Sequence, residues 1–308
     1  MPAEKYKLLK KESELICLKE ALYGNRVFMF RDDPTDFAFG GNKVRFYEYL
    51  IPEIIRQKPD VLLTNGSAYS NHIRVTAEVA ALLGIQCVIL LTQDSLNENT
   101  TQNVKISLSL GAKVETVGTF ATLLKTSEYA ENLTKEGKKV FLVPTGGHLT
   151  SALNAYVSVA VDSLTKLEEK NIHPKYIFLP CASGTTHAGL LCAASRIKLP
   201  KVISFAVANK AGKAAKEIDR FIKSGNGFFP DLILEDSINV IQTDKNDYGH
   251  PDEELLDLRK NIYKTDGILL DPTYNINAFY GMSKFLSEER EKADVLYINT
   301  GGYTGEIA

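Results

Sequence analysis

The sequence predicts an α/β protein built on mostly parallel strands. After residue 60, short apolar runs alternate with stretches of helical periodicity, which is the rhythm of βαβ units. The chain has 308 residues, of which 44% are hydrophobic and 24% charged, as expected for one large globular domain or two smaller ones. No fixed-period repeat or low-complexity linker interrupts the pattern. We therefore expect parallel strands covered by helices.

The expected elements follow in order along the chain. Uninterrupted apolar runs such as Cys87–Leu91 indicate buried strands, and longer stretches with helical periodicity indicate helices. The first group comprises strands at 61–64, 87–91, 113–117, 139–143 and 176–179, separated by helices at 71–84 and 101–110, after Phe120 and after His148. The second group comprises strands at 202–207 and 294–298 and helices at 211–223, 252–263 and 276–290.

Composition and charge narrow the class of partner. The net charge is -2 and the sequence pI is near 6.3, and no long basic run is present, so neither a nucleic acid nor a membrane surface is expected as a partner. The N-terminus opens on charged residues, which indicates neither a signal peptide nor a spanning helix and favours a cytoplasmic protein. Four widely separated cysteines make disulfides and a metal site unexpected. A small-molecule substrate is the remaining expectation.

A lysine after a glycine turn is the first chemical signal. Lys43 ends the run Gly40-Gly41-Asn42-Lys43 ahead of a helical pattern. A lysine whose amine is made neutral by burial or by a cation such as Arg45 can form a Schiff base. The alternative is a surface lysine after an ordinary turn, because glycine and asparagine mark turns wherever they occur.

Two strand–helix junctions carry small polar residues. In the first, Ser70 and Asn71 precede a helix, where they either cap its amide groups or leave those amides to bind a carboxylate. In the second, residues 183–186 precede a helix in a form suited to a phosphate. This second junction is no P-loop, because Leu190 and Leu191 stand where lysine and serine or threonine are required.

A third cluster lies near the C-terminus, around Tyr248, Tyr274 and Thr300. Each residue stands at the edge of an expected strand or helix, where ligand sites of α/β folds gather. The two tyrosines either pack in the core or contact a ligand. The chain contains no Gly-x-Ser-x-Gly, His-Glu-x-x-His or Gly-x-Gly-x-x-Gly motif, so the chemistries that these motifs serve are not indicated.

In their order, these motifs resemble the pyridoxal-phosphate enzymes of the family that contains D-cysteine desulfhydrase and 1-aminocyclopropane-1-carboxylate (ACC) deaminase. The shared elements run from about Phe39 to Gly302. They are Gly-Gly-Asn-Lys at 40–43, Ser-Asn at 70–71, Pro-Thr-Gly-Gly-His at 144–148, the loop at 183–189, Asp-Pro-Thr-Tyr at 271–274 and Thr-Gly-Gly at 300–302.

The resemblance implies a fold-type-II architecture similar to the tryptophan synthase β chain, with two open, twisted, mostly parallel sheets and helices on both faces. A small α/β domain at 46–153 would be inserted into a larger cofactor domain formed by 1–45 and 154–308. A homodimer is what the family suggests.

The resemblance also implies roles for individual residues. Lys43 would bind pyridoxal 5'-phosphate covalently, and Asn71 would bond its phenolic oxygen. The remaining cofactor-binding residues would be Ser183, Gly184, Thr185 and Thr186 at the phosphate, and Asn275 and Thr300 toward the pyridine nitrogen. The substrate would be bound by Ser70, Asn71, His72 and Tyr274, and the catalytic residues would be Lys43, Ser70, Tyr248 and Tyr274.

The expected reaction is desulfhydrase-like α,β-elimination on D-cysteine or a related β-substituted alanine, giving a 2-oxo acid and ammonia. The deaminase branch of the family carries glutamate where this chain has Asn275, so no carboxylate stands ready to protonate the pyridine nitrogen. Phe46 departs from the family pattern too, because members commonly carry a second lysine there. The alternatives are ACC deaminase activity, a β-replacement synthase, and a pyridoxal-phosphate-binding protein without turnover.

Overall fold

The computed structural model describes residues 4–33, 36–92, 101–117, 122–225, 237–245 and 248–302. Backbone contacts divide these residues into two units. The first unit comprises residues 4–8 and 43–152, and the second comprises residues 9–42 and 153–302. The domains predicted at 46–153 and at 1–45 with 154–308 stay a prediction. They state which segments fold as one domain, and this requires an unfolding experiment.

The first unit is built on a four-stranded sheet in the order β5-β4-β3-β6, with every strand parallel to its neighbours. The strands are β3 (Val61–Gly66), β4 (Gln86–Leu91), β5 (Lys113–Thr116) and β6 (Val140–Val143). The helices are α1 (Asn42–Gln57), α2 (Asn71–Leu83), α3 (Gln102–Ser109) and α4 (Thr122–Lys135), and a single 3-10 turn, η1 (Thr145–Gly147), follows β6.

Helices cover both faces of this sheet, and all six residues of β3 are therefore buried. Val61 and Leu63 point to one face, where they pack with Leu133 of α4. Thr64 points to the other face and contacts His72 of α2. Because successive side chains of a strand alternate between faces, α4 and α2 lie on opposite sides of the sheet.

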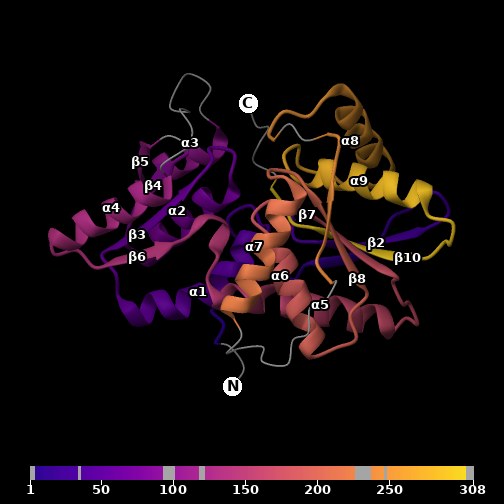
Figure 1. Cartoon of the computed structure of the whole chain (residues 1–308), viewed down its shortest axis with the longest axis horizontal. Helices are drawn as coiled ribbons and strands as arrows, with labels where there is room; N and C mark the ends of the chain where they lie inside the picture. The colour runs from indigo at the N-terminus through magenta and orange to yellow at the C-terminus, as the bar shows by residue number, and fades with distance from the viewer. Residues whose placement is uncertain are drawn as a thin grey trace. The chain divides into compact units, whose positions relative to one another are not determined.

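The second unit contains a six-stranded sheet in the order β1-β2-β10-β7-β8-β9. Its strands are β1 (Glu14–Cys17), β2 (Arg26–Arg31), β7 (Tyr176–Cys181), β8 (Lys201–Ala206), β9 (Asn239–Gln242) and β10 (Asp294–Asn299). Strand β1 pairs antiparallel with β2, and the other pairs are parallel. The helices of this part of the chain are α5 (Thr150–Glu168), α6 (Thr185–Cys192), the short η2 (Ala193–Ser195), α7 (Ala211–Ser224), α8 (Glu253–Asp266) and α9 (Asn275–Glu288) (Figure 1).

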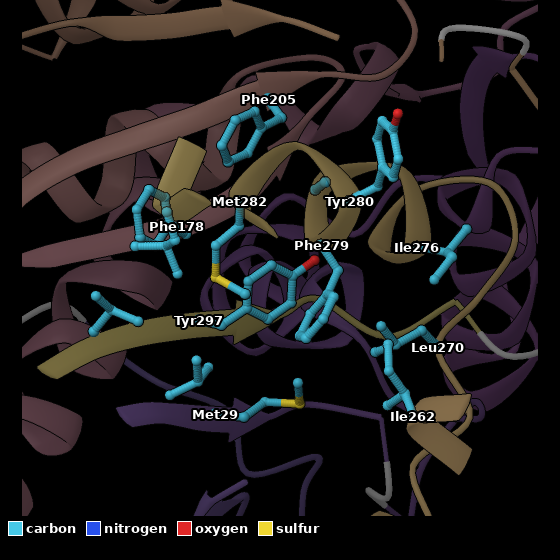
Figure 2. Close-up of a cluster of buried hydrophobic side chains, with 14 of the residues drawn as sticks. Met29, Phe178, Phe205, Ile262, Leu270, Ile276, Phe279, Tyr280, Met282 and Tyr297 are labelled. Atoms are coloured by element: carbon cyan, nitrogen blue, oxygen red, sulfur yellow. The ribbon is translucent and has the colours of Figure 1, made fainter. Parts of the chain in front are cut away.

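A hydrophobic core of this unit lies between the six-stranded sheet and α8 and α9, and Figure 2 shows its aromatic centre. The rings of Phe178 and Phe205 stack at 5.9 Å between centroids, and Phe279 of α9 meets Tyr297 edge-on at 5.4 Å. Ser204 precedes Phe205 in β8 and therefore points to the opposite face, where it contacts His187 of α6. The sheet thus separates α9 from α6.

Three strands lie outside the predicted pattern. Strands β1 and β2 precede residue 60, where no βαβ rhythm marks them, and β9 is a partly exposed edge strand of four residues. Every strand and helix that the sequence predicts is present, although the beginning of the helix expected after Phe120 lies partly outside the described residues. None of the described helices has the length and apolar character needed to cross a membrane.

Candidate active site

Two glycine turns of the second unit pack backbone against backbone at the start of α1. Gly41 (φ 96°) donates its N–H to the Asp32 carbonyl oxygen at 2.8 Å, and Asn42 donates to the Thr300 carbonyl oxygen at 2.9 Å. A Cβ at Gly301 (φ 72°) would lie 2.5 Å from the Cα of Gly41, so a side chain has no room there. The glycines of both motifs are therefore required for the close approach that fixes where α1 begins.

Lys43 is the second residue of α1, and its amine contacts two residues of the first unit. Its Nζ donates to the Gly146 carbonyl oxygen at 3.0 Å and lies 4.7 Å from the centroid of the Phe46 ring. Burial lowers the pKa of Lys43 from 10.5 to about 7. Arg45 is not among the causes of this shift, so of the two causes that the sequence suggests, burial is the one that the structure contains.

Ser70 caps helix α2 with its side chain. Its Oγ accepts the N–H of His72 at 3.2 Å, and its own N–H donates to the Ser67 carbonyl oxygen at 3.0 Å. The capping role that the sequence offers as one alternative is thus present. Of the three amides expected to receive a carboxylate, those of Ser70 and His72 are engaged within the protein, and the Asn71 amide has no acceptor among the described residues.

His72 is buried and neutral. Thr64 donates its hydroxyl proton to the Val143 carbonyl oxygen at 2.8 Å, so the contact of 2.9 Å between Thr64 Oγ1 and His72 Nε2 requires the proton on Nε2. Burial, with Lys43 and His148 as further causes, lowers the pKa of His72 to about 3. The ring of His72 therefore adds no positive charge beside Lys43.

The N-terminus of α6 forms a cradle of backbone amides in the second unit. The cap is Gly184 (φ 86°), which has no side chain to accept a hydrogen bond from the first turn, and a Cβ there would lie 2.6 Å from Ile218 Cγ1. Thr186 Oγ1 accepts from the Asn42 side-chain amide at 2.9 Å, which leaves its hydroxyl proton to donate elsewhere. Ser183 and Thr185 are joined by a hydroxyl contact of 3.2 Å. The cradle thus presents donors to an anion.

Tyr248 and Tyr274 lie together in the second unit. Their phenolic hydroxyls are hydrogen-bonded to each other, and their rings meet edge-on with centroids 5.5 Å apart. In this contact one hydroxyl donates and the other accepts. The Tyr274 amide donates to Asp271 Oδ1 at 2.7 Å, which holds the tyrosine at the start of α9.

Asn275 is fully buried and is bonded on both sides of its amide. Its Oδ1 accepts the Thr300 N–H at 3.1 Å, and its Nδ2 donates to Asp271 Oδ2 at 2.5 Å and to the Gly301 carbonyl oxygen at 2.9 Å. Thr300 Oγ1 lies 3.4 Å from the same Nδ2. Asn275 therefore ties the turn at Thr300 to α9, and this amide separates Thr300 from the carboxylate of Asp271.

Asp271 is the carboxylate of this cluster. It accepts from the backbone amides of three successive residues, Thr273, Tyr274 and Asn275, in addition to the Asn275 side chain. Burial nevertheless raises its pKa to about 6, with the hydrogen bonds opposing that shift. All its strong acceptor positions are occupied by the first turn of α9.

The structure thus places the predicted residues in two groups. Lys43, Ser70, Asn71 and His72 belong to the first unit, and the second unit contains Ser183, Gly184, Thr185, Thr186, Tyr248, Tyr274, Asn275 and Thr300. Sequence reasoning missed the polar partners of these residues, namely Asn42, Arg74, Asn103 and Asp271. Asn42 and Asp271 stand inside the quoted motifs, whereas nothing in the sequence marks Arg74 or Asn103.

Comparisons with known proteins show which family and which structures the chain resembles. A family model described as "Pyridoxal-phosphate dependent enzyme" matches residues 13–301. D-cysteine desulfhydrase of Serratia proteamaculans (strain 568) is 30% identical over 291 residues, which cover 91% of this chain and 87% of that protein. A Pyrococcus furiosus protein provisionally named 1-aminocyclopropane-1-carboxylate deaminase is 27% identical over 288 residues, covering 92% and 87%. The crystal structure of an ACC deaminase homologue matches with a TM-score of 0.84 at 26% identity, covering 98% and 93%.

Proposed function

Because the chain belongs to the family of pyridoxal-phosphate-dependent enzymes, we propose that it catalyses desulfhydrase-like α,β-elimination on a small amino acid. The substrate would be D-cysteine or a related β-substituted alanine, and the products a 2-oxo acid and ammonia. The predicted enzyme class, cofactor and fold type II are confirmed by the family and by the relatives of the same architecture. The identity of the substrate is the part that we propose.

The described residues fit pyridoxal 5'-phosphate. Gly184 caps α6 without a side-chain acceptor, and a phosphate at this helix N-terminus would supply acceptor oxygens there. Lys43 supplies an amine with a pKa near 7, which is able to bind the cofactor's carbonyl carbon. We assign the phosphate to Ser183, Gly184, Thr185 and Thr186. Phe46, which replaces the second lysine of the family pattern, contributes to the apolar surroundings of the Lys43 amine.

The ring of the cofactor would be held by neutral groups. Asn71 would donate to its phenolic oxygen, and Thr300 would be the partner of its pyridine nitrogen. Asn275 would act on that nitrogen through Thr300, because both sides of its amide are already bonded within the protein. The observation that carries the choice of elimination is that Asp271, the carboxylate of this cluster, is occupied by four N–H donors and bonds Asn275 rather than Thr300.

When bound, the cofactor supplies an electron sink for the charge that develops at the substrate's Cα. Lys43 would then remove the Cα proton, since its pKa near 7 keeps a large fraction of the amine neutral at working pH. The backbone N–H of Asn71 would bind the substrate carboxylate, next to the cap residue Ser70 and to His72. We assign the protonation of the departing sulfur to the pair formed by Tyr248 and Tyr274, whose phenolic hydroxyls contact each other. The unsaturated product then hydrolyses to a 2-oxo acid and ammonia.

The proposal is tested on the purified protein by its visible absorbance and by product analysis. We expect a cofactor band that changes on adding D-cysteine, together with pyruvate and sulfide. Lys43→Ala should lose at least about 1,000-fold of the rate, because the base and the covalent link are removed together. A protein that shows the band but gives no pyruvate from D-cysteine or other β-substituted alanines would refute the elimination.

ACC deaminase activity is a second candidate, favoured by the TM-score of 0.84 to an ACC deaminase homologue. The same samples distinguish the two reactions, because ring opening of ACC gives 2-oxobutanoate rather than pyruvate. We expect turnover of ACC to be slower than that of D-cysteine, since no carboxylate contacts Thr300 in the described part of the chain. Faster release of 2-oxobutanoate would favour the second candidate.

Two further properties, the location and the oligomeric state, belong to the proposal. A reducing, cytoplasmic location is supported by four free cysteines, three of them buried. A homodimer is supported by the family resemblance alone, and analytical ultracentrifugation tests it directly. Fractionation of the source cells tests the location.

A further inference from the structure

Arg74 of α2 is a fully buried arginine in the first unit. Its Nη1 donates to Glu78 Oε2 at 3.1 Å, and its Nε donates to Asn103 Oδ1 at 3.0 Å across to α3. Burying a guanidinium is costly even when it is paired, and a leucine or methionine would join the two helices at lower cost. Packing of α2 against α3 therefore does not explain why an arginine is buried at this position.

Arg74 determines the orientation of the Asn103 amide. A guanidinium only donates hydrogen bonds, so the group that faces Arg74 Nε must be the oxygen of Asn103. The Asn103 Nδ2 is then turned the other way, where it donates to the Tyr69 carbonyl oxygen at 3.1 Å. That carbonyl only accepts, so contacts on both sides of the amide require the same orientation.

Asn103 in turn determines the orientation of the Asn71 side-chain amide. Asn103 Nδ2 lies 3.4 Å from Asn71 Oδ1, and a donor at that place requires the oxygen of Asn71 to face it. The Nδ2 of Asn71 is then left pointing away from α3, and no acceptor for it is recorded among the described residues. A chain of two donated bonds thus fixes which end of the Asn71 amide is offered to a ligand.

We propose that Arg74 and Asn103 are positioning residues that hold Asn71 as a hydrogen-bond donor toward an anionic ligand oxygen, the phenolic oxygen of pyridoxal phosphate. The inference rests on the assignment of Asn71 under the proposed function. If the Asn71 amide were reversed, its Oδ1 would face that oxygen and repel it. The donor stabilises the negative charge on the phenolic oxygen, and so it strengthens cofactor binding and lowers the pH at which the bound cofactor's visible band titrates.

Asn103→Asp is the decisive variant. An aspartate keeps the size of the side chain and the pairing with Arg74, but it can only accept, so Asn71 is expected to turn its Nδ2 toward residue 103. We expect cofactor affinity to fall about tenfold and the band to titrate at higher pH, because one hydrogen bond to a charged group is replaced by a repulsive contact. Both quantities are read from absorbance and need no substrate.

Arg74 offers a matched pair of substitutions. Arg74→Lys keeps a cation that only donates hydrogen bonds, so the cofactor band should titrate close to its wild-type pH. Arg74→Met keeps the length of the side chain without a donor, so the band should titrate at higher pH, as in Asn103→Asp. Ser107→Ala is the control, because Ser107 is buried in α3 and its Oγ donates only to the Asn103 backbone oxygen at 2.8 Å. Its loss affects packing near Asn103 without touching the direction of the side-chain bonds.

The possible results distinguish failure of the positioning role of Arg74 and Asn103 from failure of the assignment of Asn71. Wild-type affinity and titration in Asn103→Asp would overturn it, and so would an equal shift in Ser107→Ala, which would indicate a merely structural effect. Unchanged cofactor binding in Asn71→Ala would overturn it together with the assignment of Asn71. The proposed reaction can fail separately, by absence of pyruvate, without altering these absorbance readouts.

Discussion

At the scale of single residues, the direction of each hydrogen bond limits what a side chain can offer to a ligand. Thr186 accepts from Asn42 and so retains a proton to donate, and His72 is bonded through the protonated nitrogen Nε2. For Lys43 the charge of the amine, rather than the direction of its hydrogen bond, determines what the side chain can do. Its amine donates to the Gly146 carbonyl oxygen, and burial is the cause that lowers its pKa.

Lys43 should make the stability of the cofactor-free protein rise with pH. Its pKa is about 7 in the folded protein and near 10.5 in the unfolded chain, so between these values the unfolded chain binds the additional proton. One such proton gives a slope of at most about 1.4 kcal/mol per pH unit, with stability increasing as pH rises. We expect urea unfolding at pH 7.5 and 9 to show that wild type gains stability relative to Lys43→Met. A constant difference between the two would contradict the lowered pKa.

Asn275→Asp should destabilise the protein in a pH-dependent way. The new carboxylate would face Asp271 Oδ2, which the Asn275 amide now contacts at 2.5 Å. Two buried carboxylates in contact raise each other's pKa, so the variant keeps most of its stability at low pH and loses it as pH rises beyond about 6. We expect a deficit of about 3 kcal/mol at pH 8 and a smaller one at pH 5, measured by thermal unfolding.

Asn275→Ala is the control for that experiment. It removes the same bonds to Thr300, Gly301 and Asp271 without adding a charge, so its deficit should grow between pH 5 and pH 8 only through the lost hydrogen bond to Asp271, and by less than that of Asn275→Asp. Parallel pH profiles for the two variants would show that carboxylate repulsion is not the cause.

At the scale of elements, the turn η1 connects the end of the four-stranded sheet to Lys43. Thr145 donates its hydroxyl to Asn65 Oδ1 in β3, and the next residue, Gly146, accepts from Lys43 Nζ. Gly146 has φ 75° and Gly147 φ 77°, so the turn needs two glycines in the left-handed region. A side-chain bond to the sheet therefore holds the carbonyl that orients the lysine.

Thr145→Val should lower kcat about tenfold, because it keeps the shape of the side chain but releases the turn from β3. Thr145→Ser keeps the hydroxyl and should remain near wild type. Thr126→Val is the matched control, since it removes the other hydrogen bond of Asn65, from Nδ2 to Thr126 Oγ1 at 2.8 Å, without touching the turn. Steady-state kinetics with D-cysteine, the proposed substrate, measure all three. An equal loss of kcat in Thr145→Val and Thr126→Val would mean that the rate depends on the placement of Asn65 and not on the attachment of the turn to β3.

At the scale of the whole molecule, local sequence patterns predicted more of the fold than of the site's supporting contacts. The strands β3, β4 and β7 contain uninterrupted apolar runs, and each run forms the strand expected. The four middle residues of β2 are buried too, but the position of this strand beside β10 depends on a parallel pairing across more than 260 residues, which no local pattern contains. Asn103 and Arg74 were missed for the same reason, because their role arises from contact between two helices.

The two units should unfold as separate cooperative transitions, because each has its own sheet and its own apolar cluster. Phe178→Ala removes a ring from the centre of the second unit's core, and Leu63→Ala opens a cavity in that of the first. Each should cost about 3–5 kcal/mol, equivalent to roughly 10 °C for a unit of this size. Calorimetry of the cofactor-free protein should show Phe178→Ala lowering one heat-absorption component and Leu63→Ala the other. A single peak that moves equally in both variants would show one cooperative unit, and the domain boundaries expected from the sequence would then not be folding boundaries.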